Sequence, residues 1–140
     1  MVTTQKSSIG ILLIDQHAMI RVALAAGLEV YDELVLLGEA EDGETGLHCA
    51  ARLQPDVVIT EIFLPQMSGI ELTKQLTENH PDMKVIVLST SINQADIDAV
   101  LAAGARKYLS KNSISVDELV QAIHEVVEPS AAFHGRIDGQ

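Results

Sequence analysis

The chain has 140 residues, which is enough for one domain with a buried core and too few for two. Its 47% hydrophobic content excludes an intrinsically disordered segment, and no apolar run approaches the roughly 20 residues that span a bilayer. With 9 basic and 20 acidic residues, the formal net charge is −11, which disfavours direct binding to nucleic acids or anionic membranes.

The single cysteine, Cys49, cannot form an internal disulfide, and residues 1–8 lack the apolar stretch of a secretory signal. Both features predict a cytoplasmic protein.

Short apolar runs alternate with segments in which apolar residues recur every three or four positions. In chain order, this pattern predicts a strand at 9–14, a helix at 17–29, a strand at 34–40, a helix at 43–53, a strand at 56–61, a helix at 68–79, a strand at 84–89, a helix at 93–103, a strand at 106–110 and a helix at 115–127. Asp42, Ser68 and Ser115 are expected to cap three of the helices, the last through a capping box with Glu118.

For the last two helices the spacing also predicts the buried face. We expect Ile97, Val100 and Leu101 to face inward from the helix at 93–103, and Gly104 to follow its end. The inward residues of the last helix are expected to be Val116, Leu119, Val120, Ile123 and Val127.

The repeated order of strand and helix predicts an α/β domain with a doubly wound, five-stranded parallel sheet and helices on both faces. Functional groups collect beyond the carboxyl ends of such strands. At these ends stand Asp15 and Gln16, Glu61, Ser89, and Lys111. Taken singly, each has another explanation as a turn cap, a solvated strand end or a surface lysine. Their joint placement predicts a site.

Four segments carry a resemblance to a known family: residues 12–17, 55–69, 85–89 and 108–111. In order, spacing and strand placement they resemble the receiver domains of bacterial two-component response regulators, including the Pro-x-Met-x-Gly loop at 65–69. The resemblance covers residues 9–127 and implies a flavodoxin-like strand order of 2-1-3-4-5. It leaves residues 1–8 as an N-terminal extension. Residues 128–140 resemble the linker that precedes a helix-turn-helix DNA-binding domain in one large subfamily.

In that family two adjacent acids after the first strand and an aspartate after the third strand hold Mg²⁺, and the aspartate accepts a phosphoryl group from a histidine kinase. Here the adjacent acids correspond to Asp15 and Gln16, and the phosphoacceptor corresponds to Glu61. The phosphoryl-contacting hydroxyl, the aromatic switch residue and the lysine correspond to Ser89, Tyr108 and Lys111.

Gln16 and Glu61 thus depart from the family pattern, which has an acid and an aspartate at these positions. Both departures should weaken metal binding or phosphoryl transfer. The neutral amide of Gln16 removes an anionic ligand, so we expect weak or absent Mg²⁺ binding, no other cofactor, and Asp15 as the residual metal ligand. The extra methylene of Glu61 moves its carboxylate by roughly 1.5 Å, which should make phosphoryl transfer poor. It also moves the charge toward Ser89 and Lys111, where an ion pair with Lys111 would imitate part of the phosphorylated state.

Our preferred interpretation is therefore an atypical receiver that signals through protein–protein contacts without aspartyl phosphorylation. The alternative is a receiver switched by a ligand or by phosphorylation of a neighbour such as Ser89 or Thr90. We do not expect an enzyme, because the G-x-G-x-x-G, G-x-x-x-x-G-K-[ST] and G-x-S-x-G patterns do not occur.

The resemblance also implies a partner surface, formed by the fourth helix, fifth strand and fifth helix, for a protein partner or a homodimer. Arg106, Lys107 and Tyr108 stand on its strand, where two basic residues suit an acidic partner. The alternative is a solvated edge strand that its charges protect. If the chain is part of a transcription regulator, DNA binding belongs to an output domain outside these 140 residues.

Overall fold

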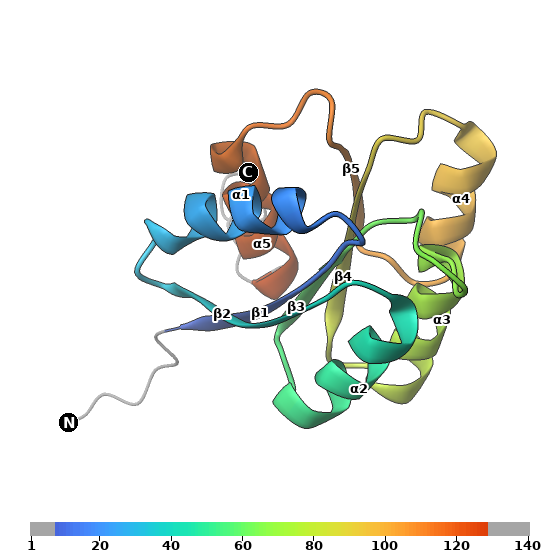
Figure 1. Ribbon diagram of the computed structural model, residues 1–140, viewed down its shortest axis with the longest axis horizontal. Coiled ribbons are helices and arrows are strands. Elements are labelled where there is room, and N and C mark those ends of the chain that lie inside the picture. Colours follow the sequence, from blue (N-terminus) through green and yellow to red (C-terminus); the bar gives the residue numbers. More distant parts are fainter. Residues whose placement is uncertain (1–7, 129–140) are drawn as a thin grey trace, which may run out of the picture.

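The computed structural model describes residues 8–128, so the predicted extension at 1–8 and tail at 128–140 lie almost entirely outside the described residues. Strands and helices alternate in the predicted order (Figure 1). The elements are β1 (Ile9–Ile14), α1 (Ala18–Glu29), β2 (Leu34–Ala40), α2 (Gly43–Leu53), β3 (Val57–Thr60), α3 (Gly69–Asn79), β4 (Lys84–Ser89), α4 (Gln94–Ala102), β5 (Lys107–Ser110) and α5 (Val116–Val127).

All strand pairs are parallel, and the five-stranded sheet has the order β2-β1-β3-β4-β5. Alternate residues of β1 face opposite layers, as the pleat of a strand requires. Ile11 and Leu13 join a core cluster with α1 and α5, whereas Leu12 and Ile14 join one with α2, α3 and α4. Figure 1 shows these two helical layers on either side of the sheet. The predicted doubly wound fold is therefore confirmed.

Element bounds differ from the predictions by a residue at a few ends. β3 is one residue shorter at each end than predicted, although the backbones of Asp56 and Glu61 still bond to the neighbouring segments: the amide of Asp56 donates to the carbonyl of Gly10 at 2.8 Å and that of Glu61 to the carbonyl of Ile14 at 3.1 Å. Asn93 lies outside α4 as its N-cap, with Oδ1 2.8 Å from the amide of Ala95. The predicted caps Asp42, Ser68 and Ser115 all accept the expected backbone hydrogen bonds.

Two predictions of buried side chains were wrong. Leu101 is 43% exposed, because α4 packs mainly against α3 and β5 and fully buries only Val100. Val116 is 38% exposed, because it is the first residue of α5 and is covered on one side only, by α1 at Gly27. Val126, which the spacing did not select, is buried instead.

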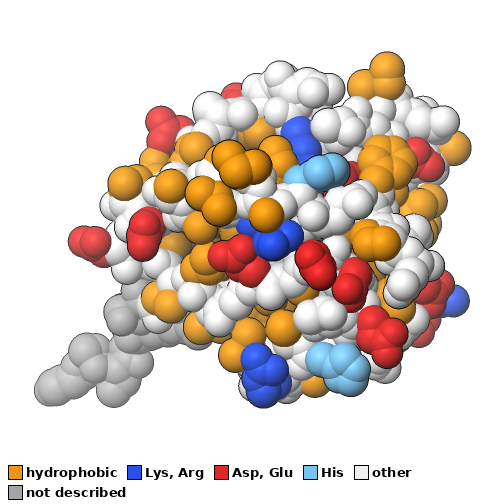
Figure 2. Space-filling model, viewed as in Figure 1, with side chains coloured by type: hydrophobic (Ala, Val, Ile, Leu, Met, Phe, Trp, Pro, Cys, Tyr) orange, Lys and Arg blue, Asp and Glu red, His pale blue; other side chains and the backbone are white. Residues whose placement is uncertain are grey.

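Some apolar side chains stay on the surface. On the face shown in Figure 2, hydrophobic side chains gather over α1, where Met19 and Val22 are exposed. Others lie on β2, which is an edge strand and has an irregular register against β1. Ile11 pairs with Leu36 and Leu12 with Gly38, so Leu37 has no counterpart and forms a bulge.

The loop between β3 and α3 holds the backbone of Glu61 in place. The amide of Gly69 donates to the carbonyl of Ile62 at 2.7 Å, which brings the start of α3 against the end of β3. A Cβ atom at Gly69 would lie 2.2 Å from the carbonyl oxygen of Glu61 and 2.7 Å from Cα of Ile62. Only glycine permits this close approach of two backbones.

Candidate functional site

Four of the predicted site residues meet at the carboxyl edge of the sheet. Asp15 follows β1, Glu61 follows β3, Ser89 ends β4 and Lys111 follows β5. Three are buried, with Asp15 4%, Glu61 3% and Ser89 0% exposed. Polar side chains this deeply buried need partners, because each unpaired group would cost free energy of folding.

The carboxylate of Glu61 has partners at both oxygens. Oε1 lies 2.6 Å from Nζ of Lys111. Oε2 accepts hydrogen bonds from the backbone amides of Ile62 at 2.7 Å and Phe63 at 3.1 Å, and from the hydroxyl of Ser89. The side chain is therefore held by a cation, a hydroxyl and two backbone N–H groups at once.

Lys111 bridges two acids. Its Nζ lies 2.6 Å from Oδ2 of Asp15 as well as from Glu61, while Oδ1 of Asp15 accepts from the backbone amide of His17 at 2.8 Å. Burial alone would lower the pKa of the Lys111 ammonium, but the hydrogen bonds and negative charges of Asp15 and Glu61 outweigh it and raise the pKa. The cluster of three side chains thus carries two negative charges and one positive charge.

Gln16 does not join this cluster. Its side chain is exposed, and Nε2 donates to the backbone carbonyl of Phe63 at 2.8 Å. It therefore ties the end of β1 to the loop after β3.

The arrangement does not suit a magnesium ion. Mg²⁺ needs several oxygen ligands in a near-octahedral shell, and anionic oxygens are the strongest of these. Among residues 8–128 no group of three or more His, Cys, Asp or Glu side chains is placed to hold a metal ion. The acids that remain, Asp15 and Glu61, already share the ammonium group of Lys111, which supplies the positive charge between them.

Tyr108 lies apart from the charged cluster and connects β5 to the loop after β4. Its hydroxyl donates to the backbone carbonyl of Ser91 and lies 3.5 Å from that of Ser89. Ser91 is buried, and its Oγ donates to Oδ2 of Asp96 in α4 at 2.9 Å. Burial raises the pKa of Tyr108, with the charges of Glu61 and Asp96 acting in the same direction against a hydrogen bond with Ser89. Ser91 thus connects the ring of Tyr108 to the first turn of α4 through two hydrogen bonds.

Residue spacing did not indicate two parts of the site. The backbone amides of Ile62 and Phe63 bind Glu61, and the carbonyl of Ser91 receives Tyr108. Main-chain donors and acceptors leave no residue-type signal. The Pro-x-Met-x-Gly loop is the nearest indication of the first pair, because Gly69 sets the turn that presents the amides.

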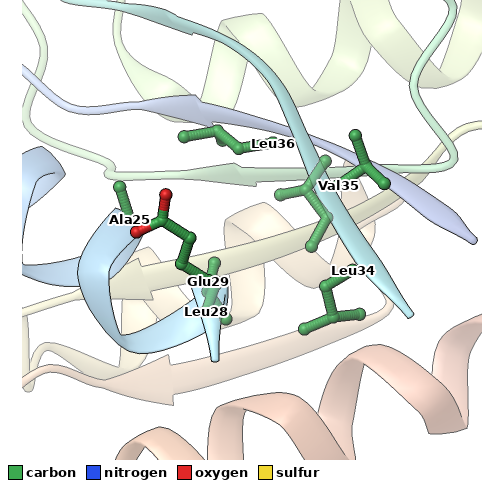
Figure 3. A pocket seen from close by; sticks show the side chains of 7 residues that line it. Ala25, Leu28, Glu29, Leu34, Val35 and Leu36 are labelled. Atoms are coloured by element: carbon green, nitrogen blue, oxygen red, sulfur yellow. The ribbon is translucent and has the colours of Figure 1, made fainter. Parts of the chain in front are cut away.

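The space directly beside the two acids is small. The void beside Asp15 and Glu61 measures about 10 Å³, which is at the lower limit for one water molecule. A larger cavity of about 270 Å³ lies elsewhere, between α1 and β2, where Figure 3 shows mainly apolar side chains with Glu29 among them.

No helix within residues 8–128 has the length and apolar character needed to cross a bilayer.

Comparisons with known proteins agree with the fold. Residues 11–124 match the response regulator receiver domain family. The chain is 37% identical over 132 residues to the transcriptional regulatory protein LiaR of Bacillus subtilis, a match that covers 94% of this chain and 62% of that protein.

Two solved structures resemble it closely. The crystal structure of a LuxR-family two-component response regulator from Aurantimonas has a TM-score of 0.81 and 26% identity, with 86% of each chain covered. A CheY-like receiver domain from Methanospirillum hungatei has a TM-score of 0.79 and 25% identity, with 90% of this chain and 98% of that one covered. The chain therefore belongs to the response regulator receiver domain family, and its relatives include transcription regulators of the LuxR type.

Proposed function

We propose that this receiver domain signals through protein–protein contacts without aspartyl phosphorylation, with Glu61 in place of a phosphorylated aspartate. One observation carries the proposal. The Glu61 carboxylate contacts Ser89 and Lys111, the two side chains that correspond to the phosphoryl-contacting positions of the family. These contacts exist in the unmodified chain, so no chemical step is needed to form them.

The same contacts oppose phosphoryl transfer. A carboxylate that accepts a phosphoryl group needs an oxygen that is free to attack along a defined line, with the charge of the phosphoryl group neutralised. Both oxygens of Glu61 are engaged, the side chain is 3% exposed, and Gln16 adds no anionic ligand for Mg²⁺. Glu61 therefore acts as a fixed structural acid in this proposal.

The state held by Glu61 is read out on the α4–β5–α5 face, the surface formed by those three elements. Tyr108 supports this assignment, because its bond to the carbonyl of Ser91 connects β5 to the loop before α4. Basic and apolar groups stand on the same face: Arg106 and Leu101 are exposed, and Lys107 pairs with Glu125 at 2.6 Å. An acidic protein partner fits this mixture.

The proposal extends to the longer protein. LiaR is a transcriptional regulatory protein, and this chain covers 62% of its length. We assign the domain the regulatory role in such a cytoplasmic transcription regulator, with DNA reached only through an output domain outside this sequence. The net charge of −11 supports this division, because a domain so acidic repels the phosphate backbone.

Intact-mass measurement after incubation with acetyl phosphate and Mg²⁺ tests the absence of phosphorylation. The parent chain, Glu61→Asp and the double variant Glu61→Asp with Gln16→Asp are compared under the same conditions. We expect no adduct on the parent and one phosphoryl group on the double variant, which restores both the acceptor and the acid pair. Glu71→Asp, an exposed acid of α3, is the matched control and should stay unmodified.

A stable adduct on the parent would overturn the proposal, and its position would identify the alternative. Thr90 is exposed and Ser89 is fully buried, so a phosphoryl group on Thr90 would indicate a receiver that is switched at a neighbouring hydroxyl.

A further inference from the structure

The cavity between α1 and β2 lies at the edge of the sheet that is opposite to β5. Its volume of about 270 Å³ is close to the lower end of the range for small-molecule sites, which begins at about 300 Å³. It is lined mainly by three residues of each element: Ala25, Leu28 and Glu29 from α1, and Leu34, Val35 and Leu36 from β2. The space is therefore sufficient for a small organic molecule.

The walls of this cavity are mostly apolar. Leu28 and Leu34 are only 3% and 7% exposed, so one side of the cavity belongs to the core. On α1, Ala25 contributes a single methyl group, which leaves space between the helix and the strand. Val35 is 41% exposed, because β2 is an edge strand. A ligand with an apolar body would cover carbon atoms that are in contact with water in the unoccupied chain, and such burial favours binding.

The carboxylate of Glu29 is the charged group at this cavity. The side chain is exposed, and Figure 3 shows it folded back along α1 toward Ala25. Within residues 8–128 no hydrogen bond or ion pair engages this carboxylate. Small-molecule sites are typically apolar with a few polar groups that fix the orientation of the ligand. An unpaired acid beside an apolar wall therefore selects a ligand that combines a cation with a hydrocarbon body.

The place of Glu29 in α1 favours the same kind of ligand. It is the last residue of the helix, where the backbone carbonyls create a partial negative charge. The last turn of α1 contains no basic residue that would balance this charge. A positively charged group beside Glu29 would thus interact favourably with the carboxylate and with the end of the helix. The formal net charge of −11 adds a longer-range attraction.

We propose that the cavity between α1 and β2 binds a small organic cation, with an ammonium group beside Glu29 and a compact hydrocarbon body against Leu28, Leu34 and Leu36. Such a ligand would join α1 to the edge strand without any covalent step. The site does not use Glu61 or the α4–β5–α5 face. It therefore stands or falls independently of the proposed signalling without phosphorylation.

Amide NMR spectra of the 140-residue chain test the site with three probes that share one hydrocarbon body. Cyclohexylmethylamine is a cation at pH 7, because alkyl amines titrate near pH 10 as lysine does, while cyclohexylmethanol is neutral and cyclohexanecarboxylate is an anion. We expect the amine to shift the amide signals of Ala25, Glu29 and residues 34–36, with a dissociation constant of about 1 mM. The alcohol should bind at the same place about fivefold more weakly, and the carboxylate more weakly still.

Glu29→Gln tests the role of the charge, because the amide keeps the shape of the side chain. It should weaken binding of the amine about fivefold, to the level of the alcohol, and leave binding of the alcohol unchanged. Glu78→Gln is the matched control: Glu78 is an exposed acid in the last turn of α3, which also lacks a basic residue there. This variant should bind all three probes as the parent does.

Ala25→Leu tests the role of the space, because it fills part of the cavity and should weaken binding of the amine and of the alcohol alike. Circular dichroism confirms that each variant folds.

Three results would overturn the proposal. The first is an absence of shifts at the cavity residues with about 10 mM amine. The second is equal weakening of amine binding by Glu29→Gln and Glu78→Gln, which would show that the amine follows the net charge of the chain and not the cavity. The third is an alcohol that binds the parent as tightly as the amine does, which would exclude selection of a cation.

Discussion

Nζ of Lys111 lies 2.6 Å from Oε1 of Glu61, and the same ammonium group lies 2.6 Å from Oδ2 of Asp15. One cation from the end of β5 is therefore shared by acids from the ends of β1 and β3. This three-way contact connects three strands at the carboxyl edge of the sheet. Its consequences for stability can be measured apart from any signalling activity.

Lys111→Met should destabilise the fold by about 3 kcal/mol, because it leaves two nearly buried carboxylates without their counter-ion. Urea unfolding at pH 7 measures the loss. Lys74→Met, at an exposed position of α3, is the control and should change the free energy of unfolding by less than about 0.5 kcal/mol. Adding Asp15→Asn to Lys111→Met should recover part of the loss; no recovery would show that the charges are not the cause.

The Lys111 contribution should disappear in alkali. Its pKa lies above the ordinary value of 10.5 in the folded chain, so the stabilisation is complete below pH 10.5 and is lost as the pH rises through the folded-state pKa. The free-energy gap between the parent and Lys111→Met should be constant from pH 7 to about 9.5 and narrow above pH 10.5. Urea unfolding of both chains across this pH range measures the free-energy gap. The raised pKa values of Tyr31 and Tyr108 act in both chains and cancel.

Tyr108→Phe should loosen the loop between β4 and α4 and leave the rest of the domain unchanged, because it removes the hydroxyl that binds the carbonyl of Ser91. Hydrogen exchange should become faster for the amides of residues 91–96, with a global loss of about 1 kcal/mol. Tyr31→Phe is the matched control: it also loses a hydroxyl contact, to Asp117 in α5, but far from this loop. Equal hydrogen-exchange rates at residues 91–96 in the two variants would show that the Tyr108 hydroxyl does not hold this loop.

Gly69→Ala should destabilise the domain by about 2–3 kcal/mol, since the added methyl group would meet the backbone of Glu61 at 2.2 Å and backbone atoms cannot rotate away. Gly43→Ala provides the comparison, because there the methyl group would meet Sδ of Met67, a flexible side chain, at 2.9 Å. Unfolding in urea at pH 7 should show a much smaller loss for Gly43→Ala. Similar losses of unfolding free energy for the two variants would mean that the close contact between position 69 and the backbone of Glu61 is not the cause of the destabilisation.

Patterns of neighbouring residues in the sequence predict the helices and strands. The apolar run at 9–14 becomes β1 with the same bounds, and Ser115 forms the predicted capping box with Glu118, because both depend only on neighbouring residues. Burial is harder to predict. Leu101 has the spacing of an inward residue, yet α4 contacts too few neighbours to cover it. The period of a helix gives its apolar direction but not the width of the surface that covers it.

The candidate site also has a part that the sequence predicts and a part that it does not. The rule for strand ends brings Asp15, Glu61, Ser89 and Lys111 to one edge, and there they lie together. The sequence does not indicate that Lys111 binds two acids, or that Gln16 turns to the carbonyl of Phe63. Such contacts depend on rotamers and on the path of the loops, which differ by ångströms among chains with the same motif.

The bulge at Leu37 bears on how the chain behaves at high concentration. β2 is an open edge of the sheet, and Val35 and Leu37 on it are 41% and 37% exposed, a combination that invites strands of other molecules to add to the sheet. The extra residue interrupts the regular pairing of β2 with β1, and a bulge of this kind bends a strand and increases its twist. Because a bulged edge is a poor template for an incoming strand, we expect this edge to resist aggregation even though its side chains are apolar.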